Sequence, residues 1–327
     1  MTDVLVLGGT GWLSGLTARR WRDAGASVTC LARGSHPAPE GTTLVVGDRD
    51  AADAYAGVAD RDWDEVVDVS RDAGQVASAV AALADRTAHW TFVSTISVYA
   101  DDDAPGADET ARLLPPLRPG DEYDYGRAKV AAEAAVRDGV GDRVAIIRPG
   151  LIVGPGDPTD RFGYWVSRLA LAGDGPVLAP DGEGRSVQVI DVRDLADALV
   201  RVGEDRRVGV ANATGSPMPF DAFLQDAVEA AGFAGALLRA SDEWMLAHEV
   251  AYWMGPRSLP LWLPADMIGF ATRDTAAYGA LGGRIRPIAQ TLRDTLADER
   301  TRGLDRARAS GLSRADELAL IAELPHF

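Results

Sequence analysis

The chain has little of several residues on which common protein classes depend. Its 327 residues include one cysteine, Cys30, and four histidines. A single cysteine excludes an internal disulfide and fits a reducing compartment. The scattered histidines offer none of the spacings typical of metal sites, and no Gly-x-Ser-x-Gly turn is present to carry a serine nucleophile. We therefore expect neither a disulfide scaffold, nor a metal centre, nor a serine hydrolase.

Positive charge and long apolar runs are also scarce. The chain has 33 Lys and Arg against 49 Asp and Glu, a formal net charge of −16, which does not favour binding to a phosphate backbone. The amino terminus enters an apolar strand pattern without a basic segment, and no apolar run is long enough to span a membrane. These absences predict a cytoplasmic protein that acts on a small-molecule substrate, with no nucleic-acid or membrane partner.

Lysine occurs only once, as Lys129, so arginine fills every other basic position. Arginine replaces lysine well as a surface cation but poorly where a compact ammonium must act as a point charge. Lys129 follows Tyr125 by four residues, which places both side chains on one face of a helix. A surface pair of this kind would stabilise the helix by only ~0.2–0.5 kcal/mol. The pair alone is equally consistent with a functional site and with a solvated helix face.

The first residues have the arrangement of a dinucleotide-binding turn. An apolar run at 4–7 ends in Gly8-Gly9-Thr10-Gly11, and a helical pattern and a second strand follow. Glycine lets a pyrophosphate approach the backbone, and the helix N-terminus supplies free amides. The third position of the Gly-x-x-Gly-x-x-Gly spacing holds Ser14, which is small enough for close packing of helix and strand. The pattern predicts nucleotide binding; the alternative is a turn that only shapes a strand–helix junction.

The end of the second strand bears on the identity of the cofactor. An acidic residue there accepts the ribose hydroxyls of NAD, whereas an arginine can hold the 2′-phosphate of NADP. The position holds Ala32, followed by Arg33. The sequence therefore favours NADP(H) over NAD(H), unless Arg33 is an ordinary surface arginine. After the third strand, Asp48 is placed to meet an adenine amino group, although aspartate is common in turns.

Strands and helices alternate as far as residue 148, which predicts an α/β fold with a doubly wound parallel sheet of the Rossmann type. We expect a dinucleotide-binding domain from 1–154 and about 186–215, and a smaller substrate-binding domain from about 155–185 and 216–327. The Pro- and Asp-rich segment 100–124 is expected to form a rim of the active site. Strands are expected at 3–7, 27–31, 43–46, 65–69, 90–93 and 144–148. Bulky residues that could line an apolar pocket, or simply form core, are Trp244, Tyr252, Trp253, Met254 and Trp262.

Several stretches together resemble the extended short-chain dehydrogenase/reductase superfamily, in its NAD-dependent epimerase/dehydratase-like group. The resemblance covers residues 1 to about 215. Within the group, the stretches at 161–165 and 212–215 are similar to the branch of chloroplast stem-loop-binding-like proteins and bacterial reductases. The matching motifs are Gly8-Gly9-Thr10-Gly11, Ser94-Thr95-Ile96-Ser97-Val98-Tyr99, Tyr125-Gly126-Arg127-Ala128-Lys129 with Glu133, the run 148–157, and Val192-Arg193-Asp194-Leu195-Ala196-Asp197.

The resemblance implies three catalytic residues. Tyr125 would be the general acid/base, and because a free tyrosine titrates near 10, the cation of Lys129 would lower its pKa. Thr95 would orient the substrate carbonyl, with Ser94 as the alternative. The resemblance also implies a homodimer formed through the Ala-rich helix that carries Tyr125. The cofactor would contact Gly8, Thr10, Gly11, Trp12, Leu13, Arg33, Asp48, Arg49, Ser70, Lys129, Pro149 and Ile152.

Two departures from the family pattern bear on the reaction. Dehydratases of the family place an acidic pair after the Ser/Thr, where this chain has Ile96-Ser97. Nucleotide-sugar enzymes carry an arginine for the substrate diphosphate where this chain has Val187, although Arg185 lies two residues earlier. The sequence therefore predicts an NADP-dependent reductase or dehydrogenase of an uncharged or weakly charged small molecule. The alternatives are a nucleotide-sugar epimerase or reductase, which an arginine pair in the pocket would favour, and a non-catalytic cofactor-binding or RNA-binding relative.

Overall fold

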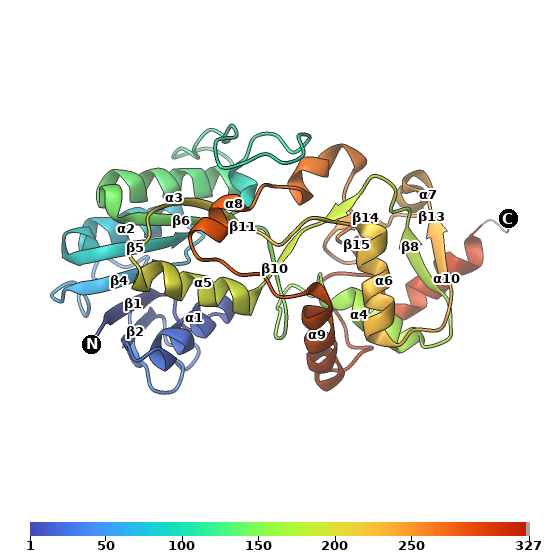
Figure 1. Cartoon of the computed structure of the whole chain (residues 1–327), viewed down its shortest axis with the longest axis horizontal. Helices are drawn as coiled ribbons and strands as arrows, with labels where there is room; N and C mark the ends of the chain where they lie inside the picture. Colours follow the sequence, from blue (N-terminus) through green and yellow to red (C-terminus); the bar gives the residue numbers. More distant parts are fainter. Residues whose placement is uncertain (325–327) are drawn as a thin grey trace.

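A seven-stranded parallel sheet forms one half of the molecule in the computed structural model, which describes residues 1–324 (Figure 1). Its strand order, β3-β2-β1-β4-β5-β6-β11, is the doubly wound order extended by β11. The predicted α/β class and Rossmann-type sheet are therefore confirmed. The strands are β1 (Asp3–Leu7), β2 (Ser27–Ala32), β3 (Thr43–Val46), β4 (Trp63–Asp68), β5 (Thr87–Val93), β6 (Val144–Pro149) and β11 (Gly209–Ala213).

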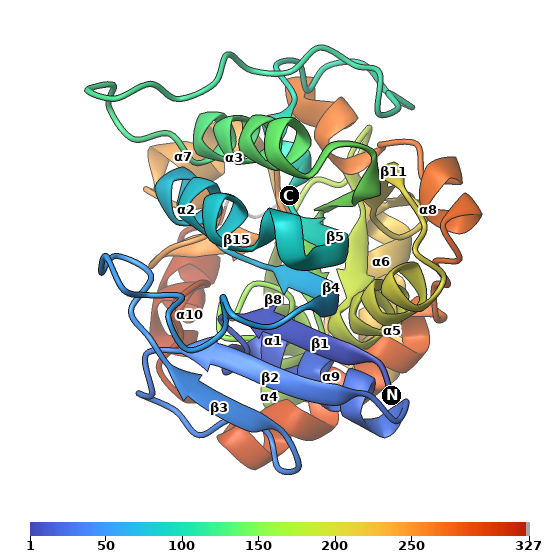
Figure 2. The ribbon, with the colours of Figure 1, turned by 90° about the vertical axis from the view of Figure 1, so that its left-hand side faces the viewer.

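Helices cover both faces of this sheet (Figure 2). One face packs against α1 (Trp12–Asp23) and α5 (Val192–Glu204), and the other against α2 (Ala73–Leu83) and α3 (Tyr125–Val140). Both faces are apolar because each buried strand alternates its side chains between two helix layers. Aspartate side chains cap α2, α3 and α5 by accepting a backbone N–H of the first turn. The cap fixes the first turn of α3, where Tyr125 lies.

The other half of the molecule is a second core built mainly from helices. Four helices, α4 (Gly163–Ala172), α6 (Phe220–Ala231), α9 (Ile288–Arg302) and α10 (Arg314–Glu323), surround the parallel pair β8 (Val177–Pro180) and β13 (Leu237–Ala240). The pair β7 (Leu151–Val153) and β10 (Val189–Asp191) runs between the two halves. Smaller elements are β9 (Ser186–Val187), β12 (Met218–Pro219), α7 (Asp242–Ala247), β14 (Ala251–Trp253), β15 (Ser258–Pro260) and α8 (Ala276–Ala280).

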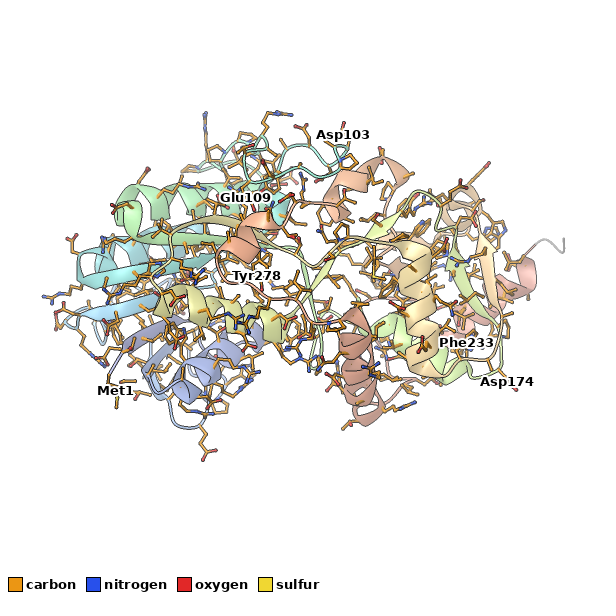
Figure 3. The ribbon with its side chains drawn as sticks, viewed as in Figure 1. Met1, Asp103, Glu109, Asp174, Phe233 and Tyr278 are labelled. Atoms are coloured by element: carbon orange, nitrogen blue, oxygen red, sulfur yellow. The ribbon has the colours of Figure 1, made fainter. Side chains whose placement is uncertain are left out.

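The predicted domain boundaries do not include α8 in the dinucleotide-binding domain, although the chain returns to the sheet there. Tyr278 of α8 is 2% exposed and packs with α5 and β6, although it belongs to the segment 216–327 assigned to the substrate-binding domain (Figure 3). Residues 325–327 of that segment lie outside the described residues. The return seals the edge of the sheet next to β11, and no periodicity in the sequence indicates it.

The segment 100–124 lies along the surface above α3 (Figures 1 and 3). Backbone hydrogen bonds join Gly106 N–H to Thr272 C=O and Asp274 N–H to Ala107 C=O, at 2.8 and 3.1 Å. Glu109 accepts the backbone N–H of Asn212 at 2.6 Å. The segment therefore fastens β11 to the chain around 272–274. Among residues 1–324, no helix has the length and apolar character needed to cross a membrane.

Candidate active site

A cavity of about 560 Å³ opens at the carboxyl ends of β1, β4, β5 and β6. Parallel sheets of this topology bind ligands at this edge. The lining comes from the glycine turn, the ends of the strands, the first turns of α3, and the segments 149–161 and 253–270. None of the lining residues belongs to 100–124, so the expectation that this segment forms the rim is not supported. The catalytic candidates Thr95, Tyr125 and Lys129 all line the cavity.

The glycine turn is tightly packed against β2 and leads into a helix N-terminus that can accept an anion. Gly8 has a φ of +80°, and a Cβ on Gly9 would lie 2.5 Å from Cys30 Sγ. The hydroxyl of Ser14 donates to Gly8 C=O at 2.6 Å and accepts from Gly11 N–H at 3.1 Å. Ser14, which departs from the glycine pattern, therefore braces the turn from inside. The first turn of α1 carries no acidic residue, so its positive helix end is available to a diphosphate.

The predicted cofactor contacts fall into two groups. Those that line the cavity are Gly8, Gly11, Trp12, Leu13, Lys129, Pro149 and Ile152, and those that do not are Thr10, Arg33, Asp48, Arg49 and Ser70. Arg33 and Asp48 are exposed just beyond β2 and β3. Arg49 instead grips Asp68 through two 2.9 Å hydrogen bonds and donates to Gln75 C=O at 2.7 Å. Its guanidinium thus holds strand ends together, and a role of this side chain toward the cofactor is not favoured.

Lys129 is buried beneath the cavity, with 2% of its surface exposed. Its ammonium donates to the backbone carbonyls of Ser70 and Val93, both at 2.6 Å, and lies 4.6 Å from the ring centre of Phe92. An ammonium has three donors, so one N–H remains for an acceptor in the cavity. Burial lowers the pKa of Lys129 from 10.5 to about 8, although the nearby charge of Asp68 raises it.

Tyr125 begins α3 and lines the cavity beside Thr95. Burial raises the pKa of Tyr125 above 10, while a hydrogen bond with Thr95 and the positive charges of Arg71 and Arg161 oppose the rise. The cations that act most clearly on this phenol are therefore the two arginines, where we expected Lys129. Thr95 Oγ1 also accepts from Ser97 N–H at 3.1 Å, which holds its side chain at the end of β5.

Ser94, the alternative to Thr95, is engaged elsewhere. Its hydroxyl donates to Glu133 at 2.5 Å, and Glu133 also accepts from Arg148 at 2.7 and 2.9 Å. Arg148 in turn donates to Tyr99 Oη at 3.0 Å. Ser94 and Glu133 are buried, at 2% and 0% exposure. This network joins β5, β6 and α3 beneath the site, and it leaves Thr95 as the hydroxyl that can meet a substrate.

Two arginines in the lining were not among the predicted site residues. Arg71 follows β4 by three positions, and Arg161 lies just before α4. Within residues 1–324, neither side chain has a carboxylate oxygen within 4.0 Å. Burial lowers the pKa of Arg161, and the charge of Arg71 lowers it further, although Asp157 and Tyr125 raise it. The position of Arg71 after a strand end was a usable signal, because that edge of the sheet binds ligands.

Aromatic and sulfur-containing side chains form the opposite wall. Trp253, Met254 and Phe270 line the cavity, and the rings of Trp253 and Phe270 pack edge to face at 5.4 Å. Trp253 has a φ of +69°, a strained backbone for a bulky residue. Two of the five bulky residues predicted for a pocket are therefore in this cavity. Of the others, Trp262 is fully buried, Trp244 stacks on His248, and Tyr252 donates to Asp242.

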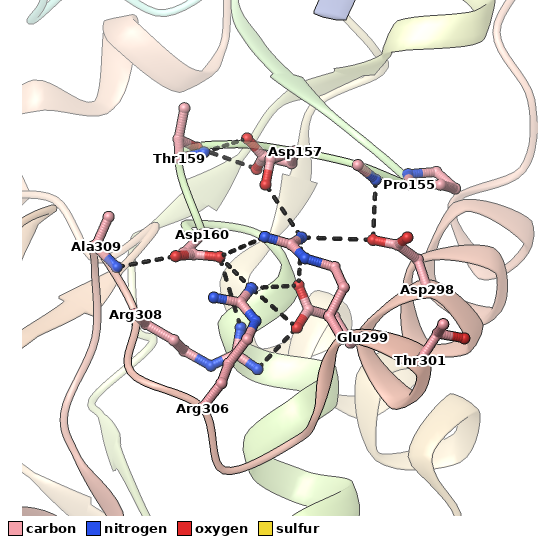
Figure 4. Close-up of polar contacts among 12 residues, drawn as sticks. Pro155, Asp157, Thr159, Asp160, Asp298, Glu299, Thr301, Arg306, Arg308 and Ala309 are labelled. Atoms are coloured by element: carbon pink, nitrogen blue, oxygen red, sulfur yellow. Dashed lines mark hydrogen bonds and ion pairs between the residues drawn. The ribbon is translucent and has the colours of Figure 1, made fainter.

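The segment 155–161 connects the glycine turn to α9 and carries Arg161. At one end, the indole of Trp12 donates to Pro155 C=O at 2.9 Å. At the other, Asp160 and Glu299 meet three arginines in an ionic cluster (Figure 4). The cluster comprises Asp160, Glu299, Arg302, Arg306 and Arg308. These contacts fix the backbone of the segment that leads into Arg161.

Comparison with known proteins gives a match to a family model and to several solved structures. Residues 4–214 match the model of the NAD dependent epimerase/dehydratase family. The structure of a "putative epimerase" from Burkholderia cenocepacia J2315 has a TM-score of 0.71 and 22% identity over 92% of this chain and 98% of that chain. The structure of UDP-N-acetylglucosamine 4-epimerase from Bacillus cereus has a TM-score of 0.67 and 16% identity over 94% of this chain and 99% of that chain. The structure of UDP-glucuronic acid 4-epimerase from Bacillus cereus, in complex with NAD, has a TM-score of 0.65 and 14% identity over 92% of this chain and 99% of that chain. At these identities the structures establish the shared fold. No match was found among curated proteins.

Proposed function

Because this chain belongs to the NAD-dependent epimerase/dehydratase family, we propose that it transfers hydride between a nicotinamide cofactor and a carbonyl or alcohol carbon in the 560 Å³ cavity. The observation that carries the proposal is the grouping of Tyr125, Thr95 and Lys129 at one wall of that cavity. The resemblance implied these three residues, and the four-residue spacing placed Tyr125 and Lys129 on one helix face. Thr95 and Lys129 are buried, at 7% and 2% exposure, whereas Tyr125 is 37% exposed.

The cofactor supplies or takes up the hydride. Tyr125 donates a proton to the substrate oxygen in reduction and accepts it in oxidation, while Thr95 fixes that oxygen by a hydrogen bond. Lys129 holds its ammonium against Ser70 and Val93 and keeps one donor for a ribose hydroxyl or for Tyr125. The charges of Arg71 and Arg161 favour the phenolate form of Tyr125 that oxidation requires.

The preferred cofactor in this proposal is NADP(H). Arg33 is exposed directly after β2, and Ala32 stands where an NAD-selective carboxylate would be. Among residues 1–324, Arg33 has no acidic side chain within salt-bridge distance. A 2′-phosphate would therefore meet a cation whose charge is not already neutralised.

Replacement of Tyr125 tests the proton-transfer role. We expect Tyr125→Phe to lower kcat ~10²–10⁴-fold in an assay of NADPH oxidation with a panel of aldehydes and ketones. The dissociation constant for NADPH should stay the same. The matched control is Tyr123→Phe, two residues earlier and 63% exposed, which should keep wild-type kcat. Unchanged turnover in Tyr125→Phe would remove this tyrosine from the mechanism.

Nucleotide-sugar epimerisation is the second candidate, and the arginine pair in the cavity is the observation in its favour. The family's diphosphate position counts against it. Val187 is buried there, and Arg185 is engaged by Leu263 C=O at 3.0 Å, Asp181 C=O at 2.9 Å and Asp242. Incubation with UDP-glucose or UDP-glucuronic acid and chromatography of the products separates the two candidates. Epimerisation without net oxidation of the cofactor would favour this one.

A further inference from the structure

The positive charge of the cavity has no internal counterpart. Arg71 and Arg161 both line it, and their charges act on each other and on Tyr125. The chain as a whole has a net charge of −16, and most arginines near the second core lie in ion pairs, as in the cluster around Asp160 and Glu299. Arg161 is half-buried and Arg71 is exposed, and like charges that line one cavity repel each other unless an anion joins them.

The carboxylate nearest to Arg161 is already engaged. Asp157 is 2% exposed and accepts the backbone N–H and the hydroxyl of Thr159, at 2.8 and 3.0 Å. Thr159 Oγ1 then accepts from Arg161 Nε at 3.2 Å. This chain of contacts orients the guanidinium, and its two terminal nitrogens have no hydrogen-bond acceptor among residues 1–324.

The wall beside the arginine is apolar. The guanidinium of Arg161 lies 5.3 Å from the ring centre of Trp253, which also packs on Phe270. A guanidinium that stacks on an aromatic ring keeps its edge free to bind an anion in a bidentate manner. The cavity therefore combines a cationic subsite with an apolar surface, and both share the cavity with the hydroxyl groups of Tyr125 and Thr95.

We propose that Arg71 and Arg161 together bind a carboxylate or phosphate group of the substrate, so that the enzyme acts on acidic carbonyl or hydroxy compounds with an apolar body. This inference rests on the proposed function for the reacting group, and it replaces the expectation of an uncharged substrate. The shared chemistry of the ligand is an anionic group with at least two oxygens, one for each guanidinium. Arg161 is the specificity residue, and the ionic cluster at Asp160 positions it.

The test uses the protein saturated with NADP⁺ and calorimetric titration of three probes. Benzoylformate carries a carboxylate, phenyl phosphate carries a phosphate, and methyl benzoylformate is the neutral counterpart of the first. We expect the wild type to bind at least one anion ~10-fold or more tightly than the ester, because hydrogen bonds to charged groups are the stronger ones. The preferred anion identifies the carboxylate or the phosphate as the natural group.

Variants then locate the preference. Arg161→Gln and Arg71→Gln should each reduce it to about twofold or less while ester binding stays the same, and Arg300→Gln, an exposed arginine of α9, should retain it. Equal binding of ester and anions by the wild type, or no binding of either anion, overturns the proposal. The proposal is also overturned if Arg161→Gln weakens the binding of the ester and of the anion by the same factor. If Arg71→Gln weakens NADP⁺ binding and leaves the preference intact, Arg71 serves the cofactor and the two-arginine site is wrong.

The binding readout is independent of hydride transfer. Tyr125→Phe should keep the preference for the anion, because its phenol is not part of the subsite. If the wild type shows no preference for the anions but Tyr125→Phe loses turnover as expected, the subsite alone is rejected. If the wild type prefers the anions but Tyr125→Phe keeps its turnover, the proposed reaction is rejected and the anion-binding site stands.

Discussion

Lys129 shows what a single residue contributes when its environment is nearly dry. Its ammonium has two backbone acceptors and the face of Phe92, but no carboxylate within 4.0 Å among the described residues. The free energy of burying the charge is therefore only partly offset, which is why its pKa falls to about 8. An arginine could not relieve this cost by deprotonation, because its pKa lies above 12. The chain's only lysine thus stands where the properties of an amine matter.

The low pKa of Lys129 makes stability depend on pH. Between pH 8 and 10.5 the unfolded chain binds more protons at this residue than the folded chain, so the free energy of unfolding rises with pH in that window. The rise attributable to this group is about 3 kcal/mol. We expect Lys129→Met to remove it, so that urea unfolding of the two proteins at pH 7, 8, 9 and 10 gives curves that converge or cross. Because both proteins share every other titrating group, parallel curves would contradict the assigned pKa.

The candidate catalytic residues, whose roles stay predictions, could be picked out from sequence because the four-residue spacing of Tyr125 and Lys129 and a family-like motif at a strand end are local features. The residues that act through distant contacts could not. The grip of Arg49 on Asp68 spans 19 positions, and the contact of Ser94 with Glu133 spans 39. The same limit hid the proposed subsite: Arg71 and Arg161 are 90 positions apart, and both line one cavity because the fold brings the segment before α4 to the edge of the sheet where β4 ends. Contacts across the fold decide which polar residues are already satisfied.

At the scale of elements, the segment 155–161 is held to α9 and the chain beyond it by ion pairs and hydrogen bonds. Glu299 on α9 is 1% exposed and accepts from Arg302, Arg306 and Arg308, at 3.1, 3.1 and 2.8 Å. Asp160 has a φ of +60° and accepts the backbone N–H of Ala309 at 2.9 Å. The cluster therefore joins α9 and the chain beyond it to the segment that presents Arg161 to the cavity.

Removing one charge from this cluster should be costly. We expect Glu299→Gln to lower the free energy of unfolding by ~3–5 kcal/mol, because it leaves three arginines short of a buried partner. The matched control is Glu323→Gln on α10, whose exposed contact with His248 at 3.5 Å is worth ~0–1 kcal/mol. Chemical denaturation of the two variants and the wild type measures both values. A change below 1 kcal/mol in Glu299→Gln would show that the cluster does not hold the segment.

The strands were predictable where their residues are apolar and less so at polar ends. The expected strands at 3–7 and 43–46 are confirmed residue for residue. Two others begin earlier than expected, at Trp63 and Thr87. The first of these strands gains Trp63, which pairs with Thr87 of β5. The second continues through His89, whose Nδ1 lies 2.5 Å from Glu65 Oε2 and whose second ring nitrogen lies 2.8 Å from Arg207 C=O. The two polar side chains satisfy each other across adjacent strands, so a polar residue in sequence does not end the strand.

At the scale of the whole molecule, the cavity lies where the two cores meet. Its walls come from the sheet half, through the glycine turn and Tyr125, and from the second half, through Arg161 and Trp253. A ligand that spans the cavity therefore contacts both halves at once. Binding should stabilise the molecule as a unit, since a ligand bound only by the folded state raises its stability.

Thermal unfolding with each cofactor tests this coupling and the role of Arg33 together. A cofactor at 100 times its dissociation constant should stabilise the protein by ~2.7 kcal/mol, and we expect NADPH to reach that effect at a much lower concentration than NADH. Arg33→Ala should bring the NADPH response close to that of NADH without changing the latter, because NADH has no 2′-phosphate to lose. A stronger response to NADH in the wild type would refute the assignment of Arg33 and leave the site intact. No response to either cofactor would mean that the turn braced by Ser14 does not accept a dinucleotide, and hydride transfer would have no donor.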